Sequence, residues 1–76
     1  MNKVKQMAKS RKVLKTDADV IAAYGGTART ARRWDVSQAA VSQWRITGVP
    51  PGHHYRMSKD LEGNGFIVDG QSLGWI

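Results

Sequence analysis

The chain has 76 residues, a net charge of +6 and no cysteine. A chain of this length forms one domain that buries only about 60% of its unfolded surface, so its core is thin. The composition excludes disulfide bonds and thiolate metal sites, and no apolar run reaches the roughly 18 residues that cross a bilayer. We therefore expect a cytoplasmic, single-domain protein without a membrane segment, stabilised by a packed core.

The positive charge is concentrated at the N-terminus. Residues 1–16 hold six bases and no acid, whereas residues 17–76 sum to zero. The six bases are Lys3, Lys5, Lys9, Arg11, Lys12 and Lys15. Because residues 1–15 are polar and lack helix-capping signals, we interpret them as a flexible basic arm and residues 16–76 as the folded domain. The arm can be interpreted as a solubility tail, as a membrane-surface segment or as an arm that wraps DNA. A separate interpretation is that translation starts at Met7.

Two short helices are predicted to follow the arm. Thr16 or Asp17 caps the first, and the glycine pair at 25–26 ends it. Thr27 caps the second, which spans residues 27–34. The expected inner residues are Val20, Ile21 and Tyr24 in the first helix and Ala28, Ala31 and Trp34 in the second.

A third helix is predicted from its cap, Ser37, to about Thr47, where Gly48 and two prolines stop it. Helical periodicity divides its residues between two sides. The inner side holds Ser37, Ala40, Val41 and Trp44. The outer side holds Ala39, Ser42, Gln43 and Ile46, with Gln38 near the boundary.

A fourth helix is predicted from Pro51 to the glycine-rich segment 63–65. Its expected inner residues are His54, Tyr55, Met57, Ser58 and Leu61. Residues 66–70 are compatible with one short strand or with half of a hairpin. The sequence therefore predicts a mainly all-α helix-turn-helix domain of four to five short helices, with or without a short C-terminal strand or hairpin.

The outer side of the third helix is small and rich in amides rather than charged. Small side chains let a helix enter deeply into the DNA major groove, which is roughly 12 Å wide, and a glutamine can bond both N6 and N7 of adenine. This chemistry suits the reading of base edges. Positive charge also gathers nearby, since residues 27–47 carry four arginines against one aspartate.

The stretch TARTARRWDVSQAAVSQW, followed closely by GVPP, resembles the helix-turn-helix of Cro-type repressors from lambdoid phages and of the similar YdaS-like regulators. The resemblance covers about residues 17–62. Ala31 matches the small residue at the helix crossing, and Ser37 matches the cap of the helix that enters the groove. The family's apolar positions after the turn are matched by Val36, Val41 and Trp44. The resemblance implies a phage or prophage repressor that binds a double-stranded operator as a homodimer, without a cofactor.

The resemblance also implies the residues of the DNA site. Base contacts carry over to Gln38, Ala39, Ser42 and Gln43. Contacts with the DNA backbone carry over to Thr27, Ser37 and Arg45. From its position in the arginine-rich stretch, Arg29 is a further candidate for phosphate contact, although exposed arginines often only solvate a helix. Arg32 and Arg33 are weaker candidates.

Two residues depart from the family pattern. Asp35 stands in the turn where the family has glycine, and a left-handed conformation there costs a non-glycine residue about 1 kcal/mol or more. Trp34 stands where the family has a smaller aliphatic residue. We expect Trp34 and Trp44 to lie in the core rather than to stack on single strands. Trp75 either closes the core or forms a dimer contact.

The rival interpretation is an antitoxin or protein-interaction module built on the same helices. We expect no enzyme, because paired carboxylates, a phosphate loop and a plausible nucleophile-base set are all missing from the sequence. His53 and His54 are adjacent and point about 100° apart on a helix, so we expect a backbone or phosphate contact rather than a metal site. The sequence indicates no small-molecule ligand.

Overall fold

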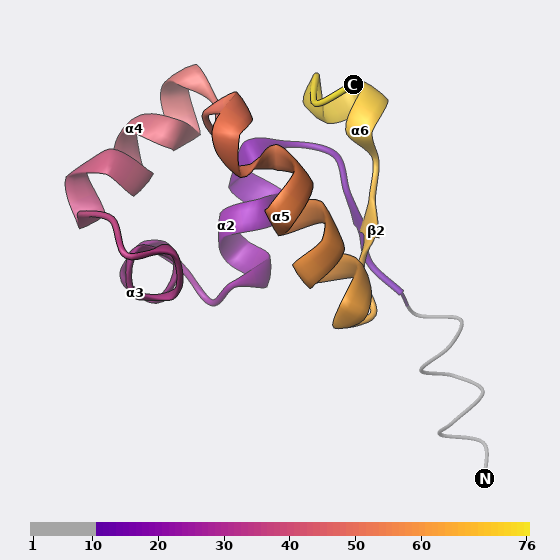
Figure 1. The fold of residues 1–76 in the computed structure, drawn as a ribbon, viewed down its shortest axis with the longest axis horizontal. Helices are drawn as coiled ribbons and strands as arrows, with labels where there is room; N and C mark the ends of the chain where they lie inside the picture. Colours follow the sequence, from indigo (N-terminus) through magenta and orange to yellow (C-terminus); the bar gives the residue numbers. More distant parts are fainter. Residues whose placement is uncertain (1–10) are drawn as a thin grey trace, which may run out of the picture.

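A computed structural model describes residues 11–76, in which five helices account for most of the ordered backbone. In chain order the elements are β1 (Val13–Leu14), α2 (Asp17–Ala23), α3 (Thr27–Trp34), α4 (Gln38–Thr47), α5 (Pro51–Gly63), β2 (Ile67–Val68) and α6 (Gly70–Leu73). Helices α3 and α4 lie at one end of the domain, the two strands and α6 lie at the other, and α2 and α5 lie between them (Figure 1). The predicted fold class, a mainly helical helix-turn-helix domain with a short C-terminal strand, is confirmed.

Helix α2 begins with a capping box. The Thr16 hydroxyl accepts a hydrogen bond from the Asp19 amide at 3.1 Å, and the Asp19 carboxylate accepts one from the Thr16 amide at 3.2 Å. These bonds satisfy amides that a helix start leaves free. The helix ends before Gly25 and Gly26, whose φ angles of 100° and 110° favour glycine. The predicted start and end of the first helix are both confirmed.

Helix α3 has the predicted bounds but not the predicted cap. Gly26 is the N-cap and Thr27 is the first helical residue, so the prediction that Thr27 caps the helix is wrong. The prediction of the buried side was also wrong at one position, because Ala28 is exposed and Thr30 is fully buried. A buried threonine is tolerated here because its hydroxyl donates to the Gly26 carbonyl at 2.7 Å.

The turn between α3 and α4 depends on one left-handed residue. Asp35 has φ 57° and ψ 50°, and the Val36 amide donates to the Ala31 carbonyl at 2.9 Å. This bond closes the end of α3 in the manner of a Schellman motif. Ser37 then caps α4 by accepting from the Ala40 amide at 3.0 Å. The predicted turn and the predicted cap are confirmed.

Helix α5 starts at Pro51 and buries Met57 and Leu61, as predicted. His54 and Ser58 are half-buried. Tyr55 is 72% exposed, so its prediction as an inner residue is wrong. The reason is geometric, because two residues along a helix correspond to a rotation of about 200°, which puts Tyr55 opposite Met57.

The two strands pair in parallel, with Val13 opposite Ile67 and Leu14 opposite Val68. The prediction of one short C-terminal strand is confirmed and the hairpin alternative is wrong, because the partner of β2 comes from the other end of the chain. Leu14 is fully buried. The predicted arm therefore ends too late, since β1 within it belongs to the folded domain, while residues 1–10 lie outside the described part of the chain.

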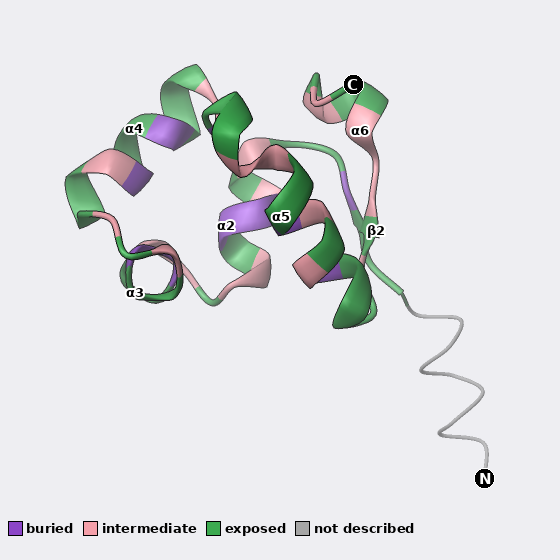
Figure 2. Ribbon diagram, viewed as in Figure 1, coloured by how far each residue is buried: buried purple, intermediate pink, exposed green. Residues whose placement is uncertain are grey.

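One apolar cluster joins the elements, and the buried stretches lie on the sides of the helices that face the middle of the domain (Figure 2). It consists of Leu14, Val20, Ile21, Ala31, Val41, Trp44, Val49, Met57 and Leu61. Trp34 and Trp75 are half-buried and pack against this cluster. Trp44 is therefore a core residue as predicted, and Trp75 helps to close the protein's own core.

A polar clamp links α2, α3 and α5 beside the apolar cluster. The Asp60 carboxylate accepts from the Tyr24 hydroxyl at 2.8 Å and from the Arg33 guanidinium at 3.0 Å. Burial, followed by the bond to Asp60, raises the pKa of Tyr24 above its ordinary value. The clamp thus ties α2 to α5 through a hydroxyl that stays protonated at neutral pH, and α3 to α5 through the Arg33 guanidinium.

Candidate nucleic-acid interface

The outer face of α4 carries the four predicted base-contacting residues. Gln38, Ala39, Ser42 and Gln43 are all exposed. Helix α4 is held from the other side by Val41, which is fully buried, and by Trp44, which is 5% exposed. Because the helix is held along that edge, the glutamines point away from the domain. Within residues 11–76 neither glutamine side chain forms a hydrogen bond, so both amides are available to a ligand.

The structure brings together two predicted backbone-contacting residues. The Arg45 guanidinium donates to the Thr27 hydroxyl at 3.0 Å, which links the C-terminal half of α4 to the start of α3. Arg45 is exposed, and one hydrogen bond leaves most of its five N–H donors free. The start of α3 itself has no side-chain cap, so no capping side chain occupies its first amides beside Thr27. These donors and the arginine charge form one polar edge of the interface.

The side chains of Ser37 and Arg29 form no hydrogen bond with that pair. Ser37 is exposed at the start of α4, so its prediction as an inner residue is wrong; its oxygen accepts the capping bond and its hydroxyl proton remains able to donate. Arg29 is exposed, and its aliphatic part lies against Gly25, where an added Cβ would approach the Arg29 Cδ to 2.6 Å. The glycine therefore leaves room for the arginine to fold back over the α2–α3 turn.

The other arginines of α3 differ in how far they are engaged. Arg29, Arg32 and Arg33 line a shallow hollow on the surface. Arg33 binds Asp60 and lies 4.5 Å above the Trp34 ring, so its charge is already partnered. Arg33 therefore stabilises the fold, and it stays a weaker candidate for phosphate contact than Arg29.

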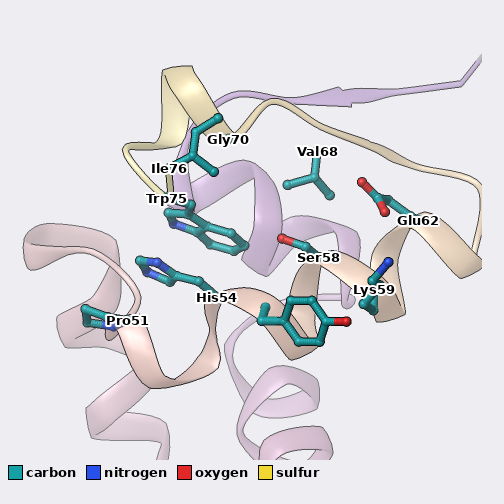
Figure 3. Close-up of a pocket in the computed structure, with 10 residues that line it drawn as sticks. Pro51, His54, Ser58, Lys59, Glu62, Val68, Gly70, Trp75 and Ile76 are labelled. Atoms are coloured by element: carbon teal, nitrogen blue, oxygen red, sulfur yellow. The ribbon is translucent and has the colours of Figure 1, made fainter.

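A second hollow, of about 530 Å³, lies between α5 and the C-terminal segment (Figure 3). The Trp75 indole stacks on the His54 imidazole at 4.5 Å, with the two rings nearly parallel. The His54 Nε2–H donates to the Val49 carbonyl at 2.6 Å, so the predicted backbone contact at the histidine pair is confirmed for this residue. Polar side chains from Ser58, Lys59 and Glu62 line one side of the hollow.

The histidines give no indication of a metal centre. His53 packs between two indoles, with ring centroids 6.0 Å from Trp34 and 5.2 Å from Trp44. Among residues 11–76 no group of three or more His, Cys, Asp or Glu side chains is placed to hold an ion. Nor is any helix in this part of the chain both long and apolar enough to cross a membrane.

Comparison with protein-family models, curated proteins and solved structures found no match to this chain. The resemblance to Cro-type and YdaS-like regulators therefore stays a prediction that the residues of α3 and α4 carry. Prediction from sequence also left one exposed residue of α4 out of the site. Ile46 is 81% exposed on the same outer face as Ala39, and its position on the helical wheel is the signal that points to it.

Proposed function

We propose that the protein is a sequence-specific transcriptional regulator that inserts α4 into the major groove of double-stranded DNA. The observation that carries this proposal is the face of Gln38, Ala39, Ser42 and Gln43, which is exposed, small and uncharged while the opposite side of α4 is buried. A helix is about 10–12 Å across with its side chains and the groove is about 12 Å wide, so small outward residues allow close approach.

One charged side chain and two hydroxyls beside the glutamine face support the proposed phosphate contacts. Arg45 and Thr27 flank the glutamine face on one side, and Ser37 marks the start of the inserted helix. Such contacts position a protein on the duplex without reading sequence, whereas the amides read base edges. The two sets of residues thus divide the work of binding between affinity and specificity.

One helix of this length reads only a few base pairs. We propose that two copies bind together, with their α4 helices about 34 Å apart on a pseudo-palindromic operator. The resemblance to Cro-type repressors supports repression, in which the occupied operator excludes the polymerase, and a phage or prophage origin. No cofactor is needed for this activity, and none of its steps is catalytic.

The experiment is a selection of bound sequences from random duplexes, followed by affinity measurements on the selected operator. Gln38→Ala and Gln43→Ala are each expected to cost roughly 1 to 3 kcal/mol of binding free energy, because each removes a bidentate contact with a base. Gln71→Ala is the matched control, since Gln71 is an exposed glutamine of α6. Circular dichroism and thermal melts check that the fold is kept.

Two results would count against the proposal. Full operator affinity in both α4 variants would show that the amides do not read bases. A selection that enriches no sequence would show that the protein is not a sequence-specific DNA binder. Either result would favour the rival class, an antitoxin or protein-interaction module that uses the same helical face.

A further inference from the structure

Ile46 occupies an unusual place on α4. It is the ninth of the ten residues of the helix and is 81% exposed. Seven residues separate it from Ala39, which is two helical turns, so the two side chains lie on nearly the same line along the helix. That line runs opposite the edge formed by Val41 and Trp44, which are buried. Ile46 and Ala39 therefore lie along the middle of the outer face.

Exposure alone does not give Ile46 a role, because single apolar residues are common on protein surfaces. The position is what matters, since the same face carries Gln38 and Gln43, whose amides are free. An apolar residue in the middle of a face that enters the major groove meets base edges. The only apolar group that the four bases present there is the C5-methyl of thymine.

We propose that Ile46, together with Ala39, reads thymine through apolar contact with its C5-methyl group. The inference rests on the proposed function and specifies what the site recognises. A rise of 1.5 Å per residue separates the two side chains by about 10.5 Å along the helix. Base pairs repeat every 3.4 Å along the duplex axis, and a helix inclined to that axis covers at most its own length along it, so the two thymines lie at most about three base pairs apart within one half-site.

The difference in size between the two side chains fits their positions. Ala39 lies at the start of α4, where a helix N-terminus enters the groove and its backbone comes close to the bases. The groove winds around the duplex while the helix is straight, so the far end of the helix moves away from the groove floor. Ile46 lies at that far end, and its longer side chain reaches across the additional distance.

The test replaces thymine by deoxyuridine, one position at a time, in the operator selected from random duplexes. The replacement removes only the methyl group and leaves the hydrogen-bonding edge intact. We expect the wild-type protein to lose affinity roughly fourfold at the thymine read by Ile46, the factor that corresponds to burial of one methyl-sized group. Ile46→Ala is expected to bind the thymine and deoxyuridine operators equally at that position, and to keep the discrimination at the thymine read by Ala39.

Ile76→Ala is the matched control, because Ile76 is an exposed isoleucine outside α4 and should leave every discrimination unchanged. Equal wild-type binding to all the deoxyuridine operators would overturn the inference while operator binding, and with it the proposed function, stands. Unchanged discrimination in Ile46→Ala would overturn the role of Ile46 in the same way. If the selection enriches no operator, the proposed function and the inference fail together.

Discussion

Replacing Asp35 by glycine is expected to stabilise the domain. Asp35 is held at φ 57° and ψ 50°, and it is the only non-glycine residue with positive φ among residues 11–76. Its carboxylate also lies at the C-terminal end of α3, where the helix dipole disfavours negative charge. Glycine avoids a left-handed penalty of about 1 to 2 kcal/mol but loses about 0.5 to 1 kcal/mol more in entropy on folding, which leaves a net gain of about 0.5 to 1 kcal/mol.

A gain of that size is measurable by thermal unfolding. For a domain of 60–100 residues, 1 kcal/mol shifts the midpoint by about 4–8 °C, so Asp35→Gly should melt about 2 to 8 °C higher. Ala28→Gly is the matched control, because Ala28 is exposed on α3 in a right-handed conformation and glycine there should destabilise by up to about 1 kcal/mol. A lower melting point for Asp35→Gly would refute the strain argument, as would an Asp35→Ala variant at least as stable as Asp35→Gly.

Three further predictions concern the rest of the chain. Leu14→Ala should destabilise the domain by about 2 to 5 kcal/mol in urea unfolding, because Leu14 is fully buried. A loss of only a few tenths of a kcal/mol, as for substitution of an exposed residue, would contradict its place in the core. Deletion of residues 1–10, if they wrap DNA, should reduce the slope of log affinity against log salt by up to about 0.9 for each phosphate that these residues neutralise, and an unchanged slope would assign them to a solubility role. Hydrogen bonds from Lys15 and Thr16 hold the pKa of Asp19 below its ordinary value, so this contribution to stability is present above about pH 4 and is lost as the pH falls through the lowered pKa. Urea unfolding at pH 5 and pH 3 should therefore show a larger loss in the wild type than in Asp19→Asn, and equal losses would contradict the capping-box explanation.

The helix-turn-helix region was predictable because its signals are local. Ser37 caps α4 through an amide only three residues away, and Asp35 adopts a left-handed turn at the position that the pattern required. The alternation of Val41 and Trp44 with the outward glutamines depends only on helical periodicity. Each of these features arises within about one or two helical turns, so the neighbouring sequence was sufficient to predict it.

The errors arose where the decisive partner is distant or where a polar group is satisfied by the backbone. Thr30 can be buried because its hydroxyl donates a hydrogen bond to the Gly26 carbonyl. The residue type alone does not show that this bond forms. Thr27 looks like a helix cap, yet the left-handed Gly26 already fills that place. In the candidate site, its hydroxyl instead accepts from Arg45, which is 18 residues further along the chain.

The clearest case is the pairing of β1 with β2, whose partners Leu14 and Val68 are far apart in sequence. Two-residue strands leave no periodic pattern, and the basic residues around Leu14 favoured its interpretation as part of an arm. The pairing goes together with burial: Leu14 lies in the core, the Asp69 amide donates to its carbonyl at 3.0 Å, and the Ile67 amide donates to the Lys12 carbonyl at 2.9 Å. β1 directly precedes the cap of α2, and α2 packs against the helix that carries the glutamines. Truncation of Leu14 should therefore lower the melting temperature and weaken DNA binding together, because it acts through the fold. Truncation of Gln38 or Gln43 should weaken DNA binding without lowering the melting temperature.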